Sequence, residues 1–100
     1  NDEWQCIARM IMEYQKDPFR YAVGIPRGGR GLGFALNAHA TDNPDHPVLI
    51  CDDVYTTGTS FKEFVIQENY NEEEIIKWVA FARKPTTDNV NALFTMPEPK

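Results

Sequence analysis

One segment strongly restricts the folds open to this chain: an apolar run that ends in two adjacent aspartates. The run, Val48 to Cys51, has the length and composition of a buried strand, and Asp52 and Asp53 follow it directly. Hydroxyl side chains then surround Gly58, and apolar residues recur at helical spacing after them. The segment therefore predicts a strand, a polar loop over 52–60 and a helix, in that order.

The same order of elements occurs earlier in the chain. The apolar run Tyr21 to Ile25 predicts a strand, four glycines follow within residues 28–33, and Leu32 to Ala40 predict a helix. Two strands that are each followed by a helix indicate a mainly parallel sheet with right-handed crossovers.

Three further elements complete the predicted domain. Trp4 to Tyr14 carry apolar side chains at helical spacing, Ile75 to Ala82 predict a third strand, and Asn91 to Thr95 predict a fourth at an edge. We therefore expect a single domain over residues 1–100 of the α/β class. It is a small three-layer fold, with a parallel sheet of three to four strands and flanking helices.

Composition and charge exclude several classes of protein. Hydrophobic residues make up 42% of the chain and charged residues 25%, as in ordinary globular domains. The formal net charge of -5 repels polyanions, so we expect no nucleic-acid partner. No apolar run approaches the roughly 18 residues of a membrane helix. We expect a cytoplasmic protein without a membrane partner.

The cysteines and histidines do not suggest a metal centre or a disulfide. Cys6 and Cys51 fall in a predicted helix and a predicted strand, so we expect both to be buried, reduced thiols. His39 and His46 lack the spacing of zinc ligands, and we expect them at a solvated loop or helix end.

The loop over 52–60 has the chemistry of a sugar-phosphate site. Its hydroxyl side chains and the amides at the start of the next helix can bind an anion. Asp52 and Asp53 would repel a bare phosphate, but ionised carboxylates accept hydrogen bonds from vicinal sugar hydroxyls. Because both loops leave the carboxyl ends of strands, the pattern predicts a ribose 5-phosphate site between them.

In its motifs the chain resembles the type I phosphoribosyltransferases. Val48 to Ser60 look like the motif by which this family binds phosphoribosyl pyrophosphate (PRPP), and Val23 to Gly29 look like its pyrophosphate loop. Val79 to Pro85 are similar to the strand that ends in a purine-contacting lysine in bacterial 6-oxopurine (xanthine-guanine type) enzymes. Arg83 and Lys84 compete for that lysine position.

The resemblance implies a role for each residue of these motifs. Asp52 and Asp53 would bind the ribose hydroxyls and form the catalytic set with Arg27, while Lys84 and Tyr55 would contact the base. The 5-phosphate would be held by Thr56, Thr57, Gly58, Thr59 and Ser60, and the pyrophosphate by Pro26, Arg27, Gly28 and Gly29. Magnesium is implied through PRPP itself, with phosphate and water oxygens as its main ligands.

The implied ligand is PRPP or a nucleoside monophosphate, and the implied reaction transfers phosphoribose to a nitrogenous base in nucleotide metabolism, such as purine salvage. Two departures bear on this. Residues 41–47 are too few to form the family's mobile lid with its strand pair, and Thr56 stands where the 6-oxopurine enzymes carry an aspartate. The alternative is a non-catalytic PRPP-binding, nucleotide-binding or scaffold module. A dinucleotide-binding site is only weakly indicated by the sequence, because the glycines lack GxGxxG spacing.

Loss of the lid strands also affects the predicted sheet. The strand at Tyr21 to Ile25 would have a bare edge, and a bare edge readily pairs with another chain. We therefore expect a homodimer or a partner chain over this edge.

Overall fold

Four strands pair in parallel to form the sheet in the computed structural model, which describes residues 2–87 and 89–96. Across the sheet they follow chain order: β1 (Ala22–Gly24), β2 (Val48–Tyr55), β3 (Ile75–Ala82) and β4 (Val90–Thr95). The predicted α/β class and parallel sheet are confirmed, and β4 is an edge strand as expected.

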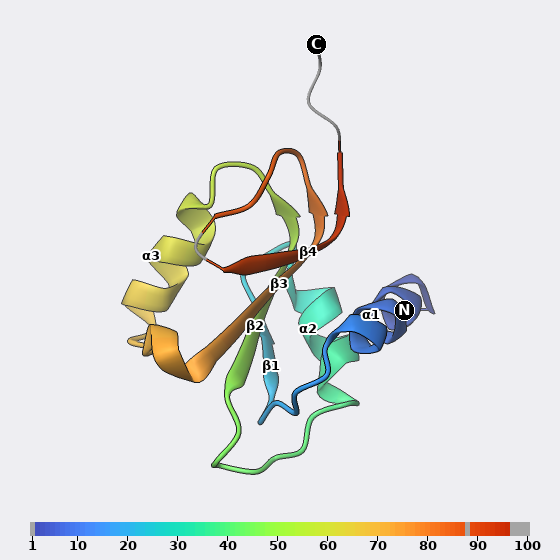
Figure 1. Cartoon of the computed structure of the whole chain (residues 1–100), viewed down its shortest axis with the longest axis vertical. Helices are drawn as coiled ribbons and strands as arrows, with labels where there is room; N and C mark the ends of the chain where they lie inside the picture. Colours follow the sequence, from blue (N-terminus) through green and yellow to red (C-terminus); the bar gives the residue numbers. More distant parts are fainter. Residues whose placement is uncertain (1, 88, 97–100) are drawn as a thin grey trace.

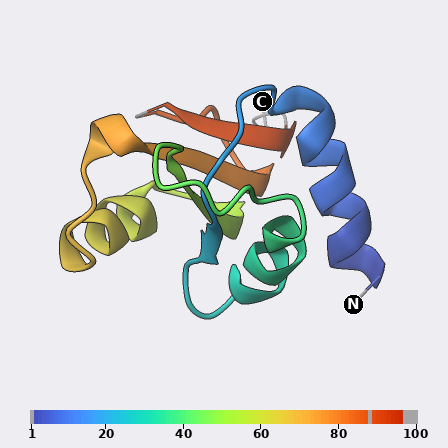
Figure 2. The same ribbon diagram turned by 90° about the horizontal axis from the view of Figure 1, so that it is seen from below.

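Helices cover both faces of this sheet (Figures 1 and 2). On one face lie α1 (Asp2–Tyr14) and α2 (Arg30–Asn37), and on the other lies α3 (Thr59–Gln67). A short 3-10 helix, Glu72–Glu74, leads into β3. Within the described residues, no helix has both the length and the apolar character needed to cross a membrane.

Each face of the sheet has its own apolar core, because neighbouring residues of a strand point to opposite faces. Leu49, Cys51 and Trp78 pack toward α1 and α2, together with Ile11 and Leu36 of these helices. On the other face Ile50, Val79 and Val90 pack against Phe61 and Val65 of α3. The central strands β2 and β3 are therefore buried on both sides, as their continuous apolar runs predict.

The two thiols differ in their exposure. Cys51 lies in the core, and its burial, with a smaller contribution from the charge of Asp52, raises the pKa of the thiol to about 12. Cys6 is exposed, so the prediction that both cysteines are buried is wrong for this one. The inner face of α1 is formed by Ala8 and Ile11, and the helical repeat turns Cys6 away from them.

Residues 38–47 connect α2 to β2 at the amino end of the sheet and form no strand. Their backbone is held to the segment that enters β1: Thr41 N donates to Phe19 O over 2.9 Å, and Arg20 N donates to Pro47 O over 2.7 Å. A connection held at the amino end cannot cover loops at the carboxyl ends of the strands.

The outer edge of β1 is less bare than the sequence predicts. Ala22 N donates to Asn37 Oδ1 over 2.8 Å, and Asn37 Nδ2 donates back to Ala22 O over 2.6 Å. The side-chain amide of α2 thus takes the place of a neighbouring strand at this residue. Both outward backbone groups of Ala22 are satisfied inside one chain, which reduces the hazard of an open edge.

Replacing Asn37 with leucine should therefore destabilise the fold. The change leaves the N–H and C=O of Ala22 without these partners, and we expect the free energy of unfolding to fall by about 1–2 kcal/mol. Urea denaturation measures this, and light scattering reports any added association through the edge. Gln5→Leu, on the exposed face of α1, is the control for a gain of apolar surface. Equal losses in the two variants would contradict this role of Asn37.

Candidate functional site

The two aspartates lie within β2, and not in a loop after it. Pairing of β2 with β3 continues past them, from Asp52 opposite Val79 to Tyr55 opposite Ala82. The predicted loop over 52–60 is therefore shorter than expected. It is limited to residues 56–58, because the long apolar run of β3 offers a pairing partner up to residue 55.

The glycine-rich loop after β1 reaches the same end of the sheet. Ile25 N donates to Cys51 O over 2.8 Å, which ties the start of this loop to β2. A Cβ atom built on Gly28 would lie 2.5 Å from Asp53 Oδ2, so a larger residue at this position would require the Asp53 carboxylate to move. The two sequence motifs thus meet at the carboxyl ends of β1 and β2, as predicted for an open parallel sheet.

The two carboxylates occupy different surroundings. Asp52 is buried, while the half-buried Asp53 carboxylate lies next to Gly28. Each carboxylate is partly engaged by the backbone: Asp52 Oδ1 accepts from Asp53 N, and Asp53 Oδ1 accepts from Val54 N, both over 2.8 Å. Asp53 is therefore the carboxylate that adjoins the glycine-rich loop.

Asp52 is 8% exposed. Burial raises the pKa of this carboxyl from an ordinary 3.8 to about 7, and the hydrogen bond and charge of the Asp53 side chain add to the rise. The backbone hydrogen bond from Asp53 opposes the shift. A carboxyl group with this pKa exchanges its proton near neutral pH, a property that often accompanies functional sites.

Hydroxyl side chains gather at the turn between β2 and α3. The turn is made by Gly58, whose φ of 82° lies in the left-handed region that favours glycine. Thr57 Oγ1 accepts from Thr59 N over 3.3 Å and lies 3.0 Å from Thr59 Oγ1. Thr56 and Ser60 are also exposed. The first-turn amides of α3 lack partners within the helix and point toward this turn, so the turn can hold an anion.

The residues predicted to meet the pyrophosphate surround the start of α2. Pro26, Arg27 and Gly28 are exposed, Gly29 is buried, and the peptide bond between Pro26 and Arg27 is cis. Arg27 places a cationic guanidinium group on the same loop whose Gly28 contacts Asp53.

The aromatic residues differ from expectation. Tyr55, predicted to contact the base, is 3% exposed, and its hydroxyl lies 3.0 Å from Thr87 Oγ1. A ring buried in this way supports the turn and offers no free face for stacking. Phe94 is 42% exposed and stacks on Phe81 with ring centroids 5.4 Å apart. Lys84 is exposed just beyond β3.

The Phe81–Phe94 stack is an aromatic surface that the sequence patterns did not single out. Its register on the sheet is informative: Val54, next to Asp53, pairs with Phe81, and Phe81 pairs with Phe94. The two rings come together because β3 pairs with the edge strand β4 in this register. The stack could be predicted from the sequence only if that register were already known.

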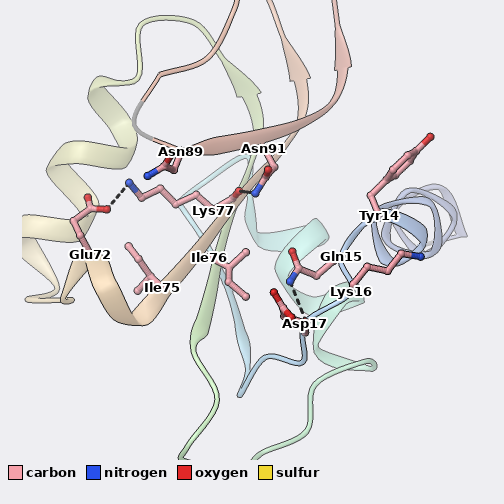
Figure 3. Close-up of a pocket in the computed structure, with 10 residues that line it drawn as sticks. All are labelled: Tyr14, Gln15, Lys16, Asp17, Glu72, Ile75, Ile76, Lys77, Asn89 and Asn91. Carbon is pink, nitrogen blue, oxygen red and sulfur yellow. Dashed lines mark hydrogen bonds and ion pairs between the residues drawn. The ribbon is translucent and has the colours of Figure 1, made fainter.

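A hollow of about 460 Å³ lies at the amino end of the sheet, opposite the two motifs (Figure 3). Several of its polar side chains are engaged with the protein. Lys77 Nζ lies 2.6 Å from Glu72 Oε2, and Gln15 accepts from Trp78 Nε1 over 2.8 Å and donates to Asp17 O over 3.0 Å. These contacts join α1 and the 3-10 helix to β3. We interpret this hollow as structural.

The described residues contain no group of three or more histidine, cysteine or acidic side chains that could hold a metal ion. A magnesium ion carried by PRPP takes most of its ligands from phosphate and water, so a site with one accessible carboxylate, that of Asp53, is compatible with it.

The chain was compared with protein-family models and with curated proteins, and neither comparison found a match. The resemblance to type I phosphoribosyltransferases therefore stays a prediction from the sequence motifs.

The raised pKa of Asp52 predicts how stability depends on pH. Between about pH 4 and 7 the folded chain binds more protons than the unfolded chain at this carboxyl, so its ionisation lowers the free energy of unfolding as the pH rises. Asp52→Asn removes the ionisation and keeps an oxygen that can accept from Asp53 N. We expect the variant to gain on the order of 2 kcal/mol relative to the natural chain between pH 5 and pH 8.

Urea denaturation at both pH values tests this prediction. Asp45→Asn, in the exposed 38–47 connection, controls for the loss of a surface charge. A difference between Asp52→Asn and the natural chain that stays constant, or that reverses as the pH rises, would sink the assignment.

Proposed function

We propose that this chain binds PRPP with magnesium, or a nucleoside monophosphate, at the carboxyl ends of β1 and β2, and transfers phosphoribose to a nitrogenous base with release of pyrophosphate. The observation that carries the proposal is the contact between the two motifs. The backbone of Gly28 lies against the carboxylate of Asp53, and the hydroxyl-rich turn follows on the same strand.

The surroundings of each group support a division of roles. Asp53 adjoins the glycine-rich loop and would accept hydrogen bonds from the ribose hydroxyls. The turn at 56–60 would hold the 5-phosphate through hydroxyl groups and the first amides of α3, and Arg27 with Gly28 would hold the pyrophosphate. Asp52, which is buried behind Asp53, would set the charge of the pair and contact the ligand less directly.

The reaction needs little from the protein beyond positioning. Displacement of pyrophosphate from the anomeric carbon develops positive charge on the sugar and negative charge on the leaving group. A site that aligns the base with the sugar and stabilises the pyrophosphate with Arg27 would supply most of the rate. The exposed Phe81–Phe94 stack is a surface on which a base could lie, with Lys84 beyond the end of the same strand. Such metabolites also favour the cytoplasm as the compartment.

One observation favours the alternative of a non-catalytic binding module. The 38–47 connection is held at the amino end of the sheet, so it does not cover the site. An open site admits water, which weakens charge interactions and allows hydrolysis to compete with transfer.

Calorimetry with magnesium and PRPP tests ligand binding. We expect measurable heat, and we expect Asp53→Asn to weaken binding by about 10- to 100-fold because a charged acceptor for the ribose hydroxyls is lost. Asp45→Asn is the matched control, since it removes the same charge from the distant 38–47 connection. Absence of heat at millimolar PRPP, or equal effects of the two variants, would rule out the proposed site.

Pyrophosphate release separates the enzyme from the binding module. The chain is incubated with PRPP and, in turn, adenine, hypoxanthine, guanine, xanthine, orotate and uracil. We expect release with at least one base, and we expect Phe94→Ala to reduce release while PRPP binding persists, because the ring is exposed and lies outside the phosphate-binding turn. Tight PRPP binding without release for any base would instead establish the module.

A further inference from the structure

Tyr55, the last residue of β2, holds the segment that follows β3 at two points. Its carbonyl oxygen accepts a hydrogen bond from Arg83 N over 3.0 Å, and its hydroxyl oxygen accepts one from Thr87 N over 3.2 Å. The Thr87 hydroxyl lies 3.0 Å from the same phenol oxygen. Both ends of the 83–87 segment are therefore attached to one residue of β2.

The same phenol group lies against the turn between β2 and α3. A Cβ atom built on Gly58 would lie 2.7 Å from the Tyr55 hydroxyl oxygen and 3.1 Å from the ring carbon that carries it. The ring is 3% exposed and belongs to the apolar core that includes Phe61 of α3. Because such a core is closely packed, a shift of the turn at Gly58 is passed on to the phenol oxygen.

The attached segment carries two cationic side chains. Arg83 and Lys84 are both exposed, and they come shortly after Phe81, whose ring stacks on that of Phe94. Pro85 follows them and restricts the backbone at this point. One phenol oxygen thus lies between the turn that can hold an anion and the segment next to the aromatic stack.

We propose that Tyr55 is a positioning residue that couples these two parts of the site. An anion held by the turn at 56–60 fixes the 83–87 segment, and with it Arg83 and Lys84, through the Tyr55 hydroxyl group. Tyr55 acts without touching the ligand, because its ring is buried. A ligand that orders the turn lowers the entropy that a second ligand at the segment has to lose, and the coupling acts equally in the reverse direction. The inference rests on the proposed function for the identity of the anion, a sugar 5-phosphate.

Amide hydrogen exchange at Thr87, measured by nuclear magnetic resonance, tests the contact without any ligand. Tyr55→Phe removes only the hydroxyl group, and we expect the Thr87 amide to exchange about fivefold faster, since it loses its acceptor. Tyr70→Phe is the matched control, because it also removes a phenol hydroxyl that lies near another, 3.4 Å from that of Tyr21. Equal exchange rates at Thr87 in the two variants would overturn the proposal.

Ribose 5-phosphate then tests the coupling. We expect it to slow exchange at Thr87 roughly threefold in the natural chain and in Tyr70→Phe. In Tyr55→Phe we expect no such response, although calorimetry still detects binding of ribose 5-phosphate to this variant. Thr87→Ser keeps a hydroxyl group beside Tyr55 and should retain the response. A purely structural role of Tyr55 would weaken binding and leave the response of the bound chain intact.

The outcomes separate this inference from the proposed function. Absence of heat with ribose 5-phosphate in the natural chain would contradict the proposed site, and the coupling with it. Heat that is accompanied by unchanged exchange at Thr87, or by the same response in Tyr55→Phe as in the natural chain, would overturn the coupling alone.

Discussion

The structure depends on close contacts between backbone segments that carry no side chains. A Cβ atom on Gly24 would collide with Gly29 O, and one on Gly29 would lie 2.6 Å from Cys51 O. These contacts hold the loop after β1 against the end of β2. As a result, Gly28 lies next to Asp53. The candidate site is thus a consequence of packing at the sheet, and a larger side chain at Gly24 or Gly29, whose neighbours are backbone atoms, would separate the two loops.

A buried carboxyl group beside this contact introduces a conflict between stability and chemistry. Asp52 continues the pairing of β2 with β3, which removes its side chain from water and favours the neutral form. A chain selected for stability alone would place an apolar residue there. An ionisable group at this position fits the proposed role of Asp52, which is to set the charge of the pair it forms with Asp53.

The outer edge of β1 is covered at one residue by a side chain of α2. At β1 the side chain of Asn37 replaces a neighbouring strand, so a three-residue strand is held without a further partner in the sheet. Next to this edge, Phe34 of α2 is 80% exposed. The outer edge of β1 is thereby less open to the addition of another strand at Ala22.

Local patterns in the chain were sufficient to predict the layers, the parallel sheet and the end of it at which the two motifs lie, because apolar runs and glycine clusters act through neighbouring residues. The span of β3 was predicted without error. The length of β2, the exposure of Cys6 and the opposite burial of Tyr55 and Phe94 were not. Each depends on which distant segment pairs or packs against the residue, and that partner is known only after the whole chain has folded.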